Sequence, residues 1–272
     1  MRLVSPAVSD RWIFLFLVAF LLLASPLSAR TYQETPDLEQ CFHDAGVTGT
    51  FVLFDVTTDT MLVHNQTRAK KRFIPASTFK IANSLIGLDT GAVKNVDEIL
   101  PYGGRPQWRK EWEQDMGLRE AIKVSNVAIY QELARRIGIN RMREGVKQLH
   151  YGNMEIGDVV DRFWLDGPLM ISAVEQTEFL SHLIGGSLPI KPEAVEAVKE
   201  ITLIEKKAGY ELHAKTGWWV GKKPPQIGWW VGWIERGDNV YPFALNIDMS
   251  KNEDAEKRVS LGRACLKRLG KL

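Results

Sequence analysis

The stretches Ile227–Glu235 (IGWWVGWIE) and Tyr241–Asp248 (YPFALNID) decide the fold of the last third of the chain. Both are rich in aromatic and β-branched residues, and a turn of Gly, Asp and Asn residues separates them. Glu211–Thr216 has the same character, and residues of this kind favour pleated, half-buried strands. The last third is therefore predicted to form three successive strands.

The first third of the chain carries a second pair of strands. Thr48–Val56 has the pattern of one strand, Thr57–Thr60 of a turn and Met61–His64 of the returning strand. Between these two sets, apolar residues recur at helical spacing. Helices are predicted over about 76–89, 118–149, 175–184 and 192–204, with a closing helix over about 254–269.

Strands at both ends with helices between them predict an α+β fold. The sheet would be largely antiparallel, built from both chain ends and flanked by helices, with a helical lobe inserted. A length of 272 residues fits a single domain over 30–272. The sheet lobe would comprise about 30–75 and 190–272, and the helical lobe about 76–189.

Residues 1–29 have the pattern of a secretory signal peptide. Arg2 and Arg11 flank a positive region, Trp12–Ala24 is an apolar run, and Ser25–Ala29 is a cleavage region. A membrane anchor is the alternative, but the run is shorter than the roughly 20 apolar residues that span a bilayer. We expect an exported, periplasmic protein without a membrane segment after cleavage.

The composition argues against several classes of function. The net charge is +2 and there is no dense basic stripe, so nucleic-acid binding is not predicted. Five histidines are scattered without ligand spacing, and no C-x-x-C pair occurs, so no metal site is predicted. Cys41 and Cys265 lie near opposite ends of the mature chain. A disulfide between them and two separate buried thiols are both open.

Ser77-Thr78-Phe79-Lys80 places a hydroxyl and an amine three residues apart, on one face of a helix. A serine hydroxyl becomes a good nucleophile once a base removes its proton. Lysine can be that base only when it is neutral or chemically altered, because its free pKa lies far above 7. Without the other motifs, this pattern would more simply indicate two polar residues on a solvated helix face, because S-x-x-K is expected about once by chance in a chain of this size.

Lys215-Thr216-Gly217 ends a predicted strand, where a cation and a hydroxyl could bind a substrate carboxylate. Gly217 would let the backbone approach a ligand closely. Ser125, in Ser125-Asn126-Val127, could pass a proton to a leaving amine. An S-x-x-K, a second serine and a K-T-G in this order are typical of serine acyl-transfer sites that attack β-lactam rings.

The chain resembles the class D serine β-lactamases, the oxacillinase type, within the superfamily of penicillin-binding proteins. Besides the three motifs, the resemblance rests on Tyr151-Gly152-Asn153, Phe163-Trp164-Leu165, Gly167-Pro168-Leu169 and Gly228–Trp233. These follow the family's order and spacing over essentially the whole mature chain. A class A enzyme would show S-D-N where this chain has S-N-V.

The resemblance implies a role for each residue of the reacting centre. Ser77 would be acylated, and Lys80, carboxylated by carbon dioxide or bicarbonate, would be the general base. Ser125 would protonate the departing ring nitrogen. Val127 would keep the pocket of Lys80 dry, and Trp164 would donate its indole N–H to the carbamate. No other cofactor and no metal are expected.

The resemblance also implies how substrate is held. Lys215 and Thr216 would bind the β-lactam carboxylate beside Gly217, with Arg258 as a further cation and Arg263 as the alternative to it. The backbone N–H groups of Ser77 and Trp218 would form the oxyanion hole. Tyr151 and Asn153 would be structural.

Hydrolysis of penicillin-type antibiotics, conferring β-lactam resistance, is the leading hypothesis. The alternative is a penicillin-binding sensor domain or D,D-peptidase that β-lactams acylate without efficient turnover. The expected partner is a small-molecule β-lactam, and the protein would be a monomer or a homodimer. Substrate spectrum depends on the loop Trp218–Gln226, for which the sequence makes no prediction.

Overall fold

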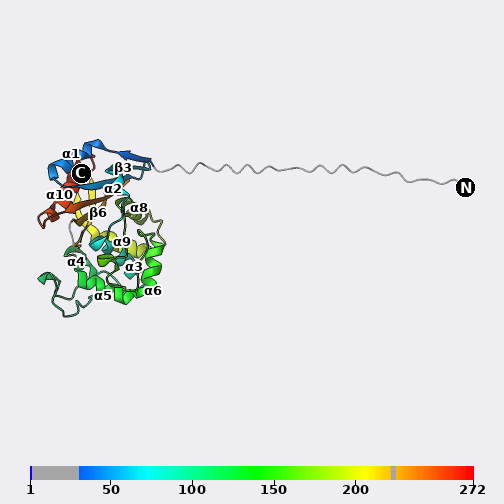
Figure 1. The fold of residues 1–272 in the computed structure, drawn as a ribbon. Helices are drawn as coiled ribbons and strands as arrows, with labels where there is room; N and C mark the ends of the chain where they lie inside the picture. Colours follow the sequence, from blue (N-terminus) through cyan, green and yellow to red (C-terminus); the bar gives the residue numbers. More distant parts are fainter. Residues whose placement is uncertain (2–30, 222–224) are drawn as a thin grey trace.

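The computed structural model describes Met1 and residues 31–221 and 225–272 (Figure 1). These residues form a seven-stranded sheet in the order β1-β3-β2-β7-β6-β5-β4. Neighbouring strands are antiparallel, apart from the parallel pair of β1 and β3. The strands are β1 (Thr31–Glu34), β2 (Gly49–Asp55), β3 (Thr60–His64), β4 (Leu203–Lys207), β5 (Tyr210–Trp219), β6 (Gln226–Arg236) and β7 (Asn239–Met249). The predicted α+β class, with a sheet built from both chain ends, is confirmed.

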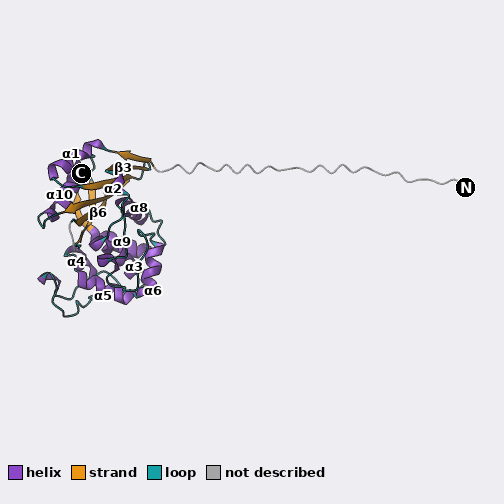
Figure 2. Ribbon diagram, in the orientation of Figure 1, coloured by secondary structure: helices purple, strands orange, loops and turns teal. Residues whose placement is uncertain are grey.

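Helices cover the sheet and fill the middle of the chain. Figure 2 shows α3, α5, α6 and α9 gathered together below the strands, and α1 and α10 away from them beside the sheet. The α-helices are α1 (Glu39–Ala45), α2 (Gln66–Ala69), α3 (Lys80–Asp89), α4 (Leu118–Lys123), α5 (Val127–Ile137), α6 (Ile139–Gln148), α7 (Phe163–Asp166), α8 (Ala173–Ile184), α9 (Pro192–Thr202) and α10 (Asp254–Arg268). Short 3₁₀ turns are η1 (Pro36–Leu38), η2 (Ala76–Phe79) and η3 (Lys110–Trp112).

The sheet separates two apolar cores. Because side chains alternate along a strand, Trp229 and Trp233 of β6 belong to the core on the helical side, whereas Trp230 belongs to the core on the opposite side. On the helical side α8 packs against β2, β6 and β7. On the opposite side α10 packs against β5, β6 and β7. There Gly262 leaves room for the Trp230 ring, since a Cβ at this glycine would lie 2.2 Å from Cε3 of Trp230.

The helix predicted over 76–89 was wrong at its start, because η2 precedes α3. Ala76, the first residue of η2, has a left-handed φ of 49°, which does not fit the regular α-helix predicted to begin there. The long helical stretch predicted over 118–149 is divided into α4, α5 and α6. Ser125 and Gly138 divide it, with φ angles of 58° and 79°.

Two edge strands were not predicted. The first, β1, has the sequence TYQE, and the second, β4, has the sequence LIEKK. Neither alternates between apolar and polar residues, because an edge strand buries little of either face. The helix predicted over 192–204 consequently ends at Thr202, and Leu203 begins β4.

The predicted signal peptide falls on residues that lie, apart from Met1, outside the described part of the chain. Within residues 31–221 and 225–272, no helix is long and apolar enough to cross a membrane.

Candidate active site

The S-x-x-K motif lies on a turn between the sheet and the helical layer. Ser77 belongs to η2, and Lys80 is the first residue of α3. The η2 turn packs against β5, β6 and α7. Trp229 of β6 fixes the backbone just before this turn, because its indole Nε1 donates a hydrogen bond to the carbonyl of Ile74 at 3.0 Å.

A buried chain of hydrogen bonds holds the same turn from the helical side. Thr78 Oγ1 donates to the carbonyl of Pro75 at 2.8 Å and accepts from Gln176 Nε2, also at 2.8 Å. Tyr151 OH donates to Gln176 Oε1 at 3.3 Å. These three side chains are at most 1% exposed. Tyr151 thus helps, through Gln176, to fix the position of Thr78, the residue next to Ser77.

Lys80 is fully buried, and its Nζ lies 2.8 Å from Ser77 Oγ. The amine also lies 5.2 Å from the ring centroid of Tyr130. Among the described residues no carboxylate pairs with it. Burial and, to a smaller extent, the charge of Lys215 lower the pKa of Lys80 well below its ordinary value. This shift favours the neutral amine, whose lone pair can accept the hydroxyl proton of Ser77.

Trp164 of α7 is fully buried and stacks on Phe79, the residue before Lys80, with ring centroids 5.4 Å apart. Its indole N–H has no acceptor within the part of the chain that the structure describes. A buried donor without a partner costs free energy. Trp164 is therefore able to bind an acceptor that the described residues do not supply.

Ser125 lies in the bend between α4 and α5, with a left-handed φ of 58°. Asn126 stabilises this bend. Its Oδ1 accepts from the backbone N–H of Ile129 at 3.3 Å, capping α5, and its Nδ2 donates to the carbonyl of Trp112 at 3.2 Å. Ser125 and Val127 consequently line the same cavity as Ser77.

The K-T-G motif lies on β5, opposite the η2 turn. Lys215 is 5% exposed, and its Nζ donates to the carbonyl of Thr216 at 2.9 Å. Burial, followed by the charge of Arg258, lowers the pKa of Lys215 to about 7. Gly217 permits the close approach of β5 to η2, because a Cβ there would lie 2.9 Å from the carbonyl oxygen of Pro75.

Arg258 reaches the same place from α10. Its Nη1 donates to the carbonyl of Gly217 at 2.7 Å, and its guanidinium carbon lies 5.7 Å from the ring centroid of Trp218. Burial lowers the pKa of Arg258 to about 10. Arg263 instead pairs with Glu205 of β4 at 2.8 Å. Of these two arginines, Arg258 is therefore the one that lines the cavity.

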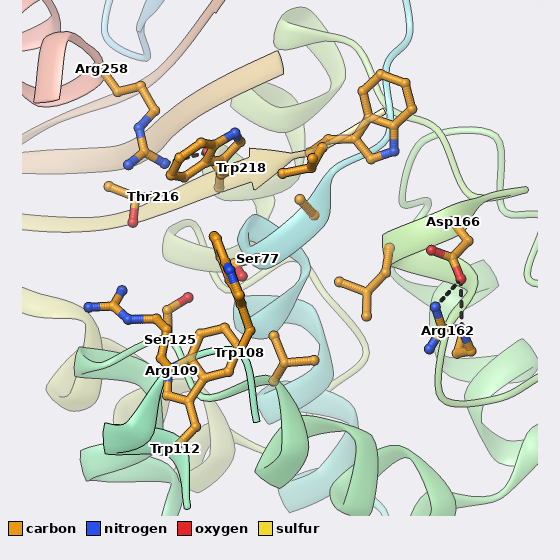
Figure 3. Close-up of a pocket in the computed structure, with 16 residues that line it drawn as sticks. Ser77, Trp108, Arg109, Trp112, Ser125, Arg162, Asp166, Thr216, Trp218 and Arg258 are labelled. Carbon is orange, nitrogen blue, oxygen red and sulfur yellow. Dashed lines mark hydrogen bonds and ion pairs between the residues drawn. The ribbon is translucent and has the colours of Figure 1, made fainter. Parts of the chain in front are cut away.

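These elements surround an open cavity of about 280 Å³. Figure 3 shows Ser77 in the middle of the cavity lining, with Ser125 on one side and Thr216 and Arg258 on another. The site thus combines the hydroxyl of Ser77, a buried amine beside it, a second hydroxyl and the cationic side chains of Lys215 and Arg258. Charged residues that also line the cavity are Arg109, Arg162 and Asp166. In the described residues no group of three or more His, Cys, Asp or Glu side chains could hold a metal ion.

Sequence reasoning missed part of the cavity wall. Trp108 is 73% exposed and lies edge-on to both Trp112 and Trp218, with ring centroids 6.1 Å and 5.9 Å away (Figure 3). Its segment follows neither helical nor strand periodicity. Gln176 was also missed, because its contact with Thr78 joins residues 98 positions apart and leaves no local signal.

The chain is similar to known proteins along most of its length. Residues 49–267 match the family model of the penicillin binding protein transpeptidase domain. The chain is 39% identical over 241 residues to β-lactamase OXA-19 of Pseudomonas aeruginosa, covering 88% of this chain and 91% of that protein. It is 39% identical over 252 residues to β-lactamase OXA-48 of Klebsiella pneumoniae, covering 93% and 94%. The crystal structure of FUS-1 (OXA-85), a class D β-lactamase from Fusobacterium nucleatum subsp. polymorphum, has a TM-score of 0.85 at 46% identity, covering 88% of this chain and 100% of that chain.

Proposed function

The chain belongs to the class D β-lactamases, and we propose that it hydrolyses penicillin-type antibiotics through an acyl-enzyme on Ser77, with Lys80 as general base. The distance of 2.8 Å between Lys80 Nζ and Ser77 Oγ carries this proposal. A base must lie within hydrogen-bond reach of the proton that it removes. Lys80 meets this condition, and its lowered pKa makes the amine able to accept.

Acylation would begin when Ser77 Oγ attacks the β-lactam carbonyl carbon and its proton passes to the base at Lys80. The C–N bond of the ring then breaks, and Ser125 gives a proton to the leaving nitrogen. The backbone N–H groups of Ser77 and Trp218 would stabilise the oxyanion. The base then returns its proton to Ser125. In deacylation, water gives a proton to the base and attacks the ester carbon, and the base passes this proton to Ser77 Oγ as the ester bond breaks.

The substrate carboxylate would bind at the opposite wall of the cavity. Thr216 offers a hydroxyl, and Lys215 and Arg258 offer positive charge. Binding an anion there would favour the protonated form of Lys215, whose pKa of about 7 leaves both forms accessible at neutral pH. Gly217 would allow the substrate to approach the β5 backbone closely.

The surroundings of Lys80 fit a carboxylated side chain. Carbon dioxide, when bound to the neutral amine as a carbamate, supplies an anionic base that is stronger than water and needs no acidic residue. The apolar pocket favours the neutral amine that this binding requires. The unpaired indole N–H of Trp164 and the hydroxyl of Ser77 would hold the added group.

We infer that the protein works in the periplasm after removal of residues 1–29, as a monomer or homodimer that needs no metal. Its partner is a small β-lactam, and its turnover confers resistance to such antibiotics. The resemblance of the first 29 residues to a signal peptide supports this location. Sequencing the N-terminus of the protein recovered from the periplasm tests it, and an intact residue 1 would contradict cleavage.

Benzylpenicillin turnover by the purified protein tests the catalytic proposal. We expect many turnovers per molecule in degassed buffer, and a faster rate when bicarbonate is added. Ser77→Ala should show neither turnover nor acylation by mass spectrometry. A single stoichiometric burst from the unaltered chain would instead support a penicillin-binding sensor or D,D-peptidase. Multiple turnovers with no response to bicarbonate would retain the Ser77 acyl-enzyme and overturn carboxylation of Lys80.

A further inference from the structure

The two cysteines lie where the first and last α-helices meet. Cys41 is on α1, Cys265 is on α10, and these two helices pack against each other (Figure 1). Both side chains belong to the apolar core on the side of the sheet away from the helical layer. Cys265 is fully buried, whereas Cys41 is partly exposed. Both cysteines are free in this structure, and the Cys41 thiol lies close enough to Cys265 to help burial raise the pKa of the Cys265 thiol.

We propose that Cys41 and Cys265 form a disulfide that fastens α1 to α10. A disulfide needs two sulfurs about 2.0 Å apart and facing each other. Because α1 and α10 pack against each other and both cysteines contact the same apolar core, the fold already brings the two side chains together. This arrangement favours the disulfide over the alternative of two separate thiols, which the sequence left open.

The bond would form by thiol–disulfide exchange with an external disulfide, such as that of a periplasmic oxidoreductase or of oxidised glutathione. The Cys41 thiolate attacks the oxidant, forms a mixed disulfide and releases one thiol. The Cys265 thiolate then attacks the Cys41 sulfur and displaces the second thiol. The two protein thiols lose two electrons and two protons, and the oxidant becomes two thiols. Cys41 reacts first because it is the more exposed of the two.

The disulfide would raise the free energy of unfolding more than most cross-links do. It joins positions near the two ends of the fold, so the closed loop contains nearly the whole described chain, and constraint of the unfolded state grows with loop length. It would also secure the helix that carries Arg258, two helical turns before Cys265. This inference concerns the scaffold and stands whether or not the proposed catalytic steps are correct.

The test uses the full mature protein, incubated under native conditions with oxidised glutathione or with dithiothreitol. After denaturation, the oxidised sample should have no free thiols, a mass about 2 Da below that of the reduced sample, and the mobility of a single chain on a non-reducing gel. Its thermal midpoint should exceed that of the reduced sample by about 5–15 °C.

Single and double variants provide the matched control. Cys41→Ser should retain one thiol in both buffers and should melt at the same temperature in each. The double variant Cys41→Ser/Cys265→Ala should behave alike in both buffers and carry no thiol. Two free thiols in the oxidised wild-type chain, a glutathione adduct that persists on Cys41, or cross-linked dimers would overturn the disulfide. Equal midpoints of the oxidised and reduced wild-type protein would overturn its fastening role.

Discussion

Lys80 and Lys215 are lysines of similar burial in different surroundings. They are 0% and 5% exposed, and desolvation is the main cause that lowers the pKa of each. Lys80 contacts the hydroxyl of Ser77, which can lose a proton. Lys215 contacts a backbone carbonyl and lies in the field of Arg258. Burial therefore lets both lysines lose their proton at a lower pH than an exposed lysine does, and in the proposed mechanism the neighbouring group decides whether each lysine serves proton transfer or anion binding.

Removing the amine of Lys80 should produce the largest effect. Lys80→Ala eliminates the group beside Ser77, so we expect kcat to fall by about 10³–10⁴, in the range of general-base loss. Deacylation should suffer most, because Lys80 carries the base proposed to activate water, while the one carboxylate among the described residues that line the cavity, Asp166, is paired with Arg162. Mass spectrometry after mixing with benzylpenicillin should reveal a persistent acyl-enzyme. A deacylation rate equal to that of the unaltered enzyme would contradict this role.

Removing the amine of Lys215 should act chiefly on binding. Lys215→Ala deletes a charge-assisted contact with the substrate carboxylate, which should raise KM by about 10–100-fold. Acyl-enzyme formed at saturating substrate should still turn over. The exposed Lys206 on β4 offers a control, and Lys206→Ala should leave KM unchanged. Equal losses of kcat in Lys80→Ala and Lys215→Ala would remove the distinction drawn between the two lysines.

The indole N–H of Trp164 should affect only the carboxylation of Lys80 and the turnover that depends on it. Trp164→Phe keeps an aromatic ring against Phe79 but deletes the donor, so turnover in degassed buffer should fall about 10-fold and recover with bicarbonate. Carbon-13 NMR with labelled bicarbonate should show weaker labelling of lysine. Trp233→Phe removes an indole N–H that already donates to Glu235, and its bicarbonate response should match that of the unaltered enzyme. Identical responses of both variants would refute the contact.

The chain from Tyr151 through Gln176 to Thr78 should have a smaller catalytic effect. Gln176→Ala leaves two buried hydroxyl groups without this partner, which should lower the free energy of unfolding by about 1–3 kcal/mol. We expect a several-fold lower kcat with unchanged KM, because the Ser77 turn loosens while the carboxylate site stays intact. Tyr151→Phe removes only the longer bond and should cost less. A change in KM alone would argue against positioning of Ser77.

Charge at Arg258 should shift the pH dependence of binding. Lys215 has a pKa of about 7 and is charged below it, so KM should rise as the pH increases through this value. Arg258→Ala removes a cation that lowers this pKa, so the rise should move to higher pH by about one unit or less. KM should also be higher throughout. Arg263→Ala, whose guanidinium pairs with Glu205, should leave the midpoint in place. An unshifted midpoint in Arg258→Ala would exclude the coupling.

The sequence predicted those features that local pattern or spacing determines. Runs of aromatic and β-branched residues located β5, β6 and β7, and the motif order identified Ser77, Ser125 and Lys215. The fold brings Ser77 and Ser125 to one cavity. It places Lys215 where its charge adds to the effect of burial and lowers the pKa of Lys80 further. Residues that act through distant partners left no local trace. The link of Gln176 to Thr78 and the position of Trp108 over the cavity depend on packing, and η2 replaced a helical start because of the Ala76 backbone.

The pairing of β2 with β7 sets when this protein can become active. Val52 of β2 pairs with Ala244 of β7, so β2, which is synthesised early, can pair on this side only after β7 has been synthesised near the end of the chain. Contacts of such long range form slowly, because the intervening chain must first be closed into a loop. The complete sheet, and with it the wall formed by β5 and α10, can therefore form only after β7 and α10 have been made.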